Sequence, residues 1–141
     1  MIDVLDVSLS LNQRPIIKDI SFEFKHGILA ILGLNGSGKT TLLKSLSGLI
    51  KPQFGHIKIF GENIANLTRK EIATRIAFVP QEISTFFSFT VHEMVLMGRT
   101  PHLSSLKLPT RYDHDIAGNA LEEVGISHLH NRQYAKLSGG E

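Results

Sequence analysis

The sequence of 141 residues contains no cysteine, which excludes disulfide bonds and thiolate metal sites and suits a reducing compartment. It has no apolar run near the roughly 20 residues that a membrane-spanning helix needs. Its start at Met1 lacks the basic segment of a secretory signal peptide. The net charge of only +2 favours a solvated surface over a nucleic-acid-binding face. We therefore expect a globular cytoplasmic protein of ordinary domain size, with no nucleic-acid partner.

The clearest motif is a glycine-rich loop at residues 33–40, which fits the P-loop pattern G-x-x-x-x-G-K-[ST]. Gly36 and Gly38 allow the backbone to curl closely around a ligand, and the curled N–H groups suit phosphate oxygens. Lys39 supplies a charge for the β- and γ-phosphates, and Thr40 offers a hydroxyl ligand to Mg²⁺. The nucleotide-binding residues predicted here are Gly33, Leu34, Asn35, Gly36, Ser37, Gly38, Lys39, Thr40 and Thr41.

The segments around the loop alternate between predicted strands and helices. The apolar run at 28–32 is typical of a buried parallel strand, and residues 41–47 have apolar side chains at helical spacing before Gly48. Further strands are expected at residues 2–9, 20–24, 56–60 and 76–79, with turns at 12–15 and 52–55. This pattern predicts an α/β nucleotide-binding core over residues 1–80.

The rest of the chain, residues 81–141, is expected to be helical and rich in loops. The pairs Thr68/Glu71, at the end of the core, and Thr90/Glu93 are spaced as capping boxes that begin helices. The second of these helices should end at Gly98, and another helix is expected from Asp115 to Val124, with Gly125 as its stop.

A second motif, Leu137-Ser138-Gly139-Gly140-Glu141, ends the sequence. Ser138 and Glu141 have capping-box spacing, so a helix should begin here and direct its N-terminus at an anion. Together with the P-loop, this segment resembles the signature of the ATP-binding subunits of ABC transporters. The resemblance covers essentially the whole chain, and Gln81 and the pair Asn131-Arg132 match further positions of that family. Residues 95–102 and 122–137 are similar to the corresponding segments in importers of ferric siderophores, haem and cobalamin.

The resemblance implies a P-loop NTPase (RecA-like) sheet core, an N-terminal antiparallel β part and a helical subdomain. It implies ATP and Mg²⁺ as ligands, with Gln81 contacting the metal or the attacking water. It also implies a head-to-tail homodimer, in which residues 137–141 face the γ-phosphate on the partner's P-loop. Such a protein is peripheral on the inner face of the cell membrane, where it contacts integral-membrane permease subunits and, indirectly, a substrate-binding protein.

Two departures from the family pattern have consequences. Leu11 stands where the family usually stacks an aromatic residue on adenine, so weaker nucleotide binding is expected. The sequence also stops at the signature, whereas the family places its Walker B strand and catalytic glutamate after it. We therefore expect a fold incomplete at the C-terminus and a chain that binds ATP without hydrolysing it.

Other interpretations remain open. The chain could be a non-transport ABC ATPase, or a truncated nucleotide-binding fragment; a GTPase is disfavoured because an Asn-Lys-x-Asp motif is absent. The histidines show no metal-ligand spacing, and His102 and His114 are isolated in the sequence. Asp113 and Asp115 indicate a solvated helix start more than a catalytic pair. Core and permease-binding interpretations are equally favoured for Phe86, Phe87 and Phe89.

Overall fold

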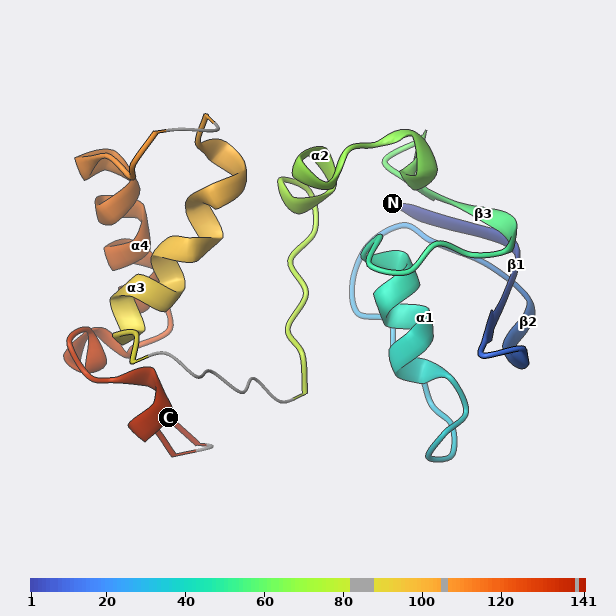
Figure 1. Cartoon of the computed structure of the whole chain (residues 1–141), viewed down its shortest axis with the longest axis horizontal. Coiled ribbons are helices and arrows are strands. Elements are labelled where there is room, and N and C mark those ends of the chain that lie inside the picture. The colour runs from blue at the N-terminus through green and yellow to red at the C-terminus, as the bar shows by residue number, and fades with distance from the viewer. Residues whose placement is uncertain (82–87, 105–106, 139) are drawn as a thin grey trace. The chain divides into compact units, whose positions relative to one another are not determined.

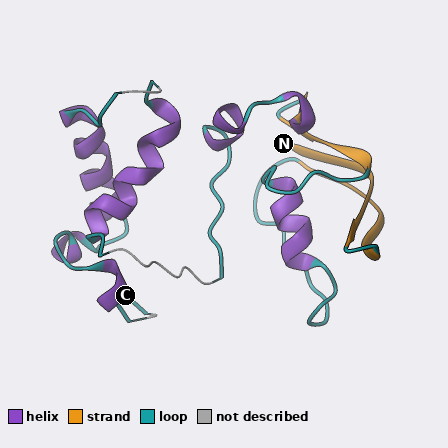
Figure 2. Cartoon of the chain, viewed as in Figure 1, coloured by secondary structure: helices purple, strands orange, loops and turns teal. Residues whose placement is uncertain are grey.

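The computed structural model describes residues 1–81, 88–104, 107–138 and 140–141. These residues form two compact units, Met1–Phe78 and Val79–Glu141 (Figure 1). Figure 2 shows that the strands belong to the first unit and that the second unit consists of helices and loops. Each unit is described on its own below. No helix in the described ranges is both long enough and apolar enough to span a membrane.

The first unit contains one antiparallel sheet with the strand order β2-β1-β3-β4. Its strands are β1 (Ile2–Leu11), β2 (Arg14–Phe24), β3 (Phe54–Ile59) and β4 (Glu62–Asn63). The predictions of strands at 2–9, 20–24 and 56–60 are confirmed, with bounds that differ by several residues. The turn between β1 and β2 is shorter than the predicted 12–15, because only Asn12 and Gln13 lie outside the strands. Both have positive φ angles, 49° and 64°, as a tight hairpin turn requires.

Two irregular positions change which side chains of the sheet point to the core. Asp6 in β1 and Asp19 in β2 have φ angles of 49° and 48°, and the strand register shifts near both. The Asp6 N–H donates to Ser21 Oγ at 2.8 Å, and the Asp19 N–H donates to Ser8 Oγ at 2.9 Å. These serines take hydrogen bonds that the regular ladder would have supplied. The buried positions of β1 consequently run Val4, Val7, Leu9 instead of alternating strictly.

Helix α1 (Lys39–Leu46) packs on the sheet through Leu42 and Leu46. The predicted helix and its stop are confirmed, since Gly48 follows with a φ of 71°. The core of this unit consists of Val4, Val7, Leu9, Ile17, Leu42, Leu46, Ile57, Ile59, Ile64 and Ile72. Ile64 comes from the short helix η1 (Ile64–Asn66).

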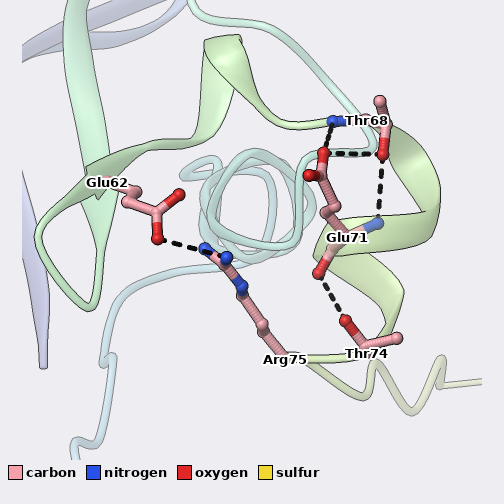
Figure 3. A network of polar contacts seen from close by, with 5 residues as sticks. All are labelled: Glu62, Thr68, Glu71, Thr74 and Arg75. Atoms are coloured by element: carbon pink, nitrogen blue, oxygen red, sulfur yellow. Dashed lines mark hydrogen bonds and ion pairs between the residues drawn. The ribbon is translucent and has the colours of Figure 1, made fainter.

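Helix α2 (Arg69–Ala73) begins at the predicted capping box. The Glu71 N–H donates to Thr68 Oγ1 at 3.2 Å, and the Thr68 N–H donates to Glu71 Oε2 at 2.7 Å (Figure 3). Arg75, just after the helix, forms an ion pair of 3.2 Å with Glu62 of β4. The network therefore fixes the start of α2 and ties its end to the sheet edge.

Two predicted strands do not form. Residues 28–32 and 76–79 lie outside the sheet, and Ile28, Leu32 and Val79 are 98%, 91% and 87% exposed. An apolar segment becomes a strand only where a neighbouring strand takes its hydrogen bonds. In the described part of the chain, the sheet ends at β2 and β4, and neither segment pairs with it. The predictions of a buried parallel strand at 28–32 and of a further strand at 76–79 are therefore wrong for this structure.

The second unit is built on α3 (Val91–Leu96) and α4 (Arg111–Glu123). Its core consists of Val91, Leu121 and Leu129, with Val95, Ile126 and Leu137 packed against them. Three short 3₁₀ helices complete it: η2 (Met97–His102), η3 (Ser127–Leu129) and η4 (Tyr134–Lys136).

The capping box Thr90/Glu93 is confirmed, but the predicted stop at Gly98 is wrong. The chain continues from α3 directly into η2, which contains Gly98 and Pro101, because a 3₁₀ turn tightens a helix end without requiring a left-handed glycine. Helix α4 begins at Arg111 instead of the predicted Asp115.

The start of α4 is a further capping box, formed by Thr110 and Asp113. The prediction that a helix starts here is thus confirmed. The prediction that the Asp113 side chain is solvated is wrong, because this side chain is buried. Asp115 is exposed. The predicted end of this helix is confirmed, since Gly125 follows it with a φ of 75°.

Candidate nucleotide-binding site

The P-loop connects the exposed run 28–32 to the first turn of α1. Gly36 and Gly38 have φ angles of 80° and 91°, the left-handed region that L side chains rarely adopt. Helix α1 begins at Lys39, directly after Gly38. The loop thus places its curled backbone next to a helix N-terminus, the combination that attracts phosphate oxygens.

Two glycines of the loop lie close to neighbouring atoms. A Cβ atom at Gly38 would lie 3.0 Å from both the carbonyl oxygen and Cγ2 of Ile16 in β2. A Cβ atom at Gly33 would lie 2.7 Å from Ser37 Oγ. Both positions lack room for a side chain without movement, so the loop packs tightly against β2 and against itself.

Lys39 is folded back over its own loop. Its Nζ donates hydrogen bonds of 2.8 Å to the Gly33 carbonyl and 2.7 Å to the Leu34 carbonyl. Two main-chain carbonyls therefore hold the ammonium group at the concave side of the loop. A phosphate group bound there would replace weak carbonyl acceptors by a charged one, which makes stronger hydrogen bonds.

The start of α1 leaves main-chain donors for a ligand. The first intrahelical bond runs from the Leu42 N–H to the Gly38 carbonyl at 2.8 Å, so the N–H groups of Lys39, Thr40 and Thr41 have no acceptor within the helix. The residues of this loop therefore fit an anionic ligand, through main-chain donors, one ammonium group and the Thr40 hydroxyl.

The other predicted nucleotide contacts belong to other elements of the chain. Leu11 is the last residue of β1, pairs with Arg14 and is exposed. Gln81 is exposed and belongs to the second unit, as do residues 137–141. Within the first unit, the structure brings residues 33–41 together as one loop and helix start.

The predicted capping pair at the end of the sequence, Ser138 and Glu141, is in contact across a turn. Ser138 donates to Glu141 Oε2 from both its N–H and its Oγ, at 2.9 Å each, and the Glu141 N–H donates to the Ser138 carbonyl at 3.1 Å. The expected capping pair is thus in contact, and the helix expected after it stays a prediction. Gly139 lies outside the described residues.

Contacts within the second unit hold this turn. The pKa of Glu141 lies below its ordinary value, mainly because of the hydrogen bonds from Ser138 and to a smaller extent because of the charge of Arg132. Arg132 forms an ion pair with Glu141, and Leu137 packs against the core of the unit. The predicted pair Asn131-Arg132 therefore contributes a cation that fixes the turn.

Of the phenylalanines after Gln81, Phe89 is half-buried, and its carbonyl accepts a 2.9 Å hydrogen bond from the Tyr134 N–H. Phe86 and Phe87 lie outside the described residues. The interpretation of these side chains as core or as a permease-binding groove stays a prediction.

Three histidines that no sequence pattern connects, His92, His114 and His130, lie together, and we term them the histidine cluster. His92 Nε2 lies 2.9 Å from His114 Nδ1, and the rings of His92 and His130 are 4.3 Å apart. His114, isolated in the sequence, is thus close to another histidine in the structure. Over the residues that are described, no group of three His, Cys, Asp or Glu side chains has the geometry to hold a metal ion.

Comparison with known proteins identifies the family. The family model described as ABC transporter matches residues 17–141. The chain belongs to the ABC transporter family. The matched range includes the P-loop and residues 137–141.

Curated relatives of this ABC transporter domain include ATP-binding proteins of importers. A hemin import ATP-binding protein of Gloeobacter violaceus is 39% identical over 142 residues, covering 100% of this chain and 51% of the relative. A chelated iron transport protein of Yersinia pestis is 38% identical over 133 residues, covering 92% of this chain and 44% of the relative. The chain spans about half the length of the curated relatives it matches.

Solved structures agree with the fold class. An ABC transporter in an inward-facing conformation matches with a TM-score of 0.81 and 32% identity, covering 99% of this chain and 50% of that one. A nucleotide-free ATP-binding cassette matches with a TM-score of 0.80 and 25% identity, covering 99% and 60%. The predicted P-loop NTPase fold with an N-terminal antiparallel part is therefore confirmed.

Proposed function

We propose that this chain is the ATP-binding part of an energy-coupling subunit of an ABC importer, with an iron complex, haem or cobalamin as the cargo of the whole transporter. The observation that carries the proposal is the P-loop, where left-handed Gly36 and Gly38 lead into α1 and Lys39 lies over the concave side. The printed names of relatives, which include hemin import, a chelated iron transport system and cobalamin import, support this class of cargo.

The residues of the loop have separate tasks in this proposal. Lys39 exchanges the carbonyls of Gly33 and Leu34 for phosphate oxygens, and the free N–H groups at the start of α1 bind the same anion. The Thr40 hydroxyl lies in the first turn of the helix and, with Gln81, would hold Mg²⁺. When bound, Mg²⁺ neutralises charge on the phosphates. Leu11 provides an apolar surface for the base.

In this proposal, the signature turn of one chain completes the nucleotide-binding site of a second copy of the chain. A head-to-tail homodimer would place Ser138, Gly140 and Glu141 of one chain opposite the P-loop of the other. The Ser138 hydroxyl is held by Glu141, so it is positioned near the surface of the second unit. Such a pair would lie on the inner face of the membrane, in contact with permease subunits and, through them, with a substrate-binding protein.

We further propose that the 141 residues bind ATP without hydrolysing it. Water activation needs a general base, which in phosphoryl transfer is a positioned side chain. The carboxylates after Val79 do not follow an apolar strand: Glu82, Glu93, Asp113, Asp115, Glu122, Glu123 and Glu141. Asp113 and Glu93 are already used as helix caps.

A binding measurement on matched lysine variants tests the proposal. Lys39→Ala removes the ammonium group from the loop, while Lys44→Ala removes one from the last turn of the same helix. A hydrogen bond to a charged group contributes about 1.5–3 kcal/mol, so Lys39→Ala should weaken binding about 10- to 100-fold. Calorimetry with Mg-ATP should show unchanged affinity for Lys44→Ala. Equal affinities for the native chain and Lys39→Ala would contradict nucleotide binding by this loop.

The transport role has a separate test. Purification of the native protein from membranes should recover integral-membrane permease subunits with it. Recovery with nucleic-acid-processing or ribosomal proteins instead would favour the non-transport alternative, without affecting the proposal for nucleotide binding.

A further inference from the structure

The histidine cluster joins three elements of the second unit. His92 lies in the first turn of α3, His114 in the first turns of α4, and His130 directly follows η3. The rings of His92 and His114 are stacked, with 5.2 Å between centroids and 13° between planes. The ring of His130 is tilted by 34° to that of His92. No nucleotide-binding motif uses these side chains.

The contact between His92 and His114 depends on how many protons the two imidazole rings carry. An N···N hydrogen bond of 2.9 Å requires one N–H group and one lone pair. It persists when one ring is charged and fails when both are, because two N–H groups then face each other. His92 Nδ1 is buried and has no hydrogen-bond partner among the described residues. A charged His92 would have a buried N–H without an acceptor, so the geometry favours the neutral ring.

Other charged groups near the cluster do not reverse this preference. Burial lowers the pKa of His92 below its ordinary 6.5, His130 and His114 lower it further, and Glu93 acts in the opposite direction. The remaining ion pairs of the surrounding elements are Arg99–Asp113 and Arg132–Glu141. The exposed titratable residues of η2 and α4 are His102, Arg111, Tyr112, His114, Asp115, Glu122 and Glu123.

Main-chain hydrogen bonds at the same place tie residues 130–134 to the start of α3. The Val91 N–H donates to the Arg132 carbonyl at 2.9 Å, and the His92 N–H donates to the His130 carbonyl at 3.1 Å. Thr90 and Gln133 also form an antiparallel bridge. Movement of the His92 ring would therefore act directly on this junction.

We propose that the histidine cluster is a proton-sensitive latch, in which the neutral His92 ring holds residues 130–134 against the start of α3 and protonation releases them. The latch belongs to the second unit and does not depend on nucleotide binding by the P-loop. Because Arg132 lies in the released segment and pairs with Glu141, acidification also loosens the signature turn.

The difference in proton binding between the closed and open states determines whether acid closes or opens the latch. A histidine with a lowered pKa binds fewer protons in the folded state than in the open one. The latch is therefore complete above pH 6.5 and weakens as the pH falls below it. For each unit by which the folded pKa lies below 6.5, the opening constant rises by up to about tenfold.

Amide hydrogen exchange on the full chain tests this latch. Protection factors, corrected for intrinsic exchange, are compared at about pH 7.5 and 5.5 in EDTA, where carboxylates stay charged. We expect protection of the Val91, His92 and Tyr134 amides to fall at the lower pH, while the amides of Val124 and Gly125, which follow α4 and bond to carbonyls of its last turn, keep theirs. Equal loss at all five amides would indicate general unfolding and overturn the proposal.

His92→Phe keeps a planar ring but cannot titrate. It should retain protection of Val91 and Tyr134 at the lower pH, whereas His128→Ala, an exposed histidine of η3, should lose it like the native chain. The same loss in His92→Phe as in the native chain would overturn the latch. If His92→Phe does not fold, NMR titration of the native chain decides: His92 must titrate below 6.5, and a higher pKa refutes the proposal.

Discussion

Arg99 Nε donates a 3.0 Å hydrogen bond to Oδ1 of Asp113 and thereby joins η2 to the first turn of α4. The second carboxylate oxygen accepts from the Thr110 N–H at 2.9 Å and from Thr110 Oγ1 at 2.7 Å. Asp113 is buried, so each of these donors replaces a water molecule. These contacts lower the pKa of Asp113 from its ordinary 3.8 to about 2, and the hydrogen bonds from Thr110 contribute more than Arg99 does.

This lowered pKa predicts an acid sensitivity of the second unit. The folded state binds fewer protons than the unfolded one between the two pKa values, so the contribution of Asp113 is complete above pH 3.8 and is lost as the pH falls towards about 2. Asp113→Asn should unfold at lower urea concentration at pH 5 and show a smaller further loss at about pH 2.5. Asp115→Asn, a neighbouring exposed carboxylate, should follow the native curve. Identical pH curves for both variants would contradict this role of Asp113.

Two glycines of the P-loop should respond differently to alanine. Gly38 has a φ of 91° and the carbonyl of Ile16 at 3.0 Å from a Cβ position, while Gly36 has a φ of 80° and no atom within 4 Å. Gly36→Ala should cost only backbone strain, about 1 kcal/mol, whereas Gly38→Ala adds a clash and should cost about 2–3 kcal/mol. Urea denaturation measures both free energies. A Gly36→Ala variant as unstable as Gly38→Ala would show that packing against β2 is unimportant.

The proposed base contact at Leu11 predicts a gain in nucleotide affinity on substitution by an aromatic residue. Stacking of a base on an aromatic ring contributes about 1–3 kcal/mol, which leucine cannot supply through a π-face. Leu11→Tyr should therefore tighten ATP binding about 5- to 100-fold in calorimetry. Leu5→Tyr, at another exposed leucine of β1, serves as the control and should leave the affinity unchanged. An unchanged dissociation constant for Leu11→Tyr would place the base elsewhere.

We expect the chain on its own not to hydrolyse ATP. The purified 141-residue chain should release no phosphate from ATP above the background of Lys39→Ala, because no side chain in it is assigned as a general base. A coupled phosphate assay at saturating Mg-ATP measures this. Phosphate release that disappears in Lys39→Ala would demonstrate a base within the chain.

Local signals predicted helix starts well. The capping boxes at Thr68 and Thr90 both form as expected, because each needs only a side chain and a main-chain N–H three residues apart. The glycine at position 48 ends α1 for a similarly local reason.

Non-local features were not predictable in this way. Residues 28–32 have the composition of a strand but lack a pairing partner in the described structure, and pairing is a property of two segments. The burial of Asp113 depends on Arg99, from a 3₁₀ helix that the pattern around Gly98 did not indicate. The histidine cluster joins residues from distant parts of the sequence.

For the site, the P-loop could be predicted because its residues are contiguous and their backbone angles follow from glycine. The fold-back of Lys39 onto Gly33 and Leu34 could not, since it depends on the path of the loop.

The two-residue turn at Asn12 and Gln13 also determines the order in which the first unit assembles. A hairpin with so short a connection closes within about 1–10 μs, since little chain entropy is lost. Pairing of β1 with β3 instead joins Leu5 to His56 across the P-loop and α1, so it has a much larger loop to close. We therefore expect the β1–β2 hairpin to form first and to offer the edge of β1 as a template. We expect the docking of β3 to be slower, because it must close the larger loop that contains residues 33–40.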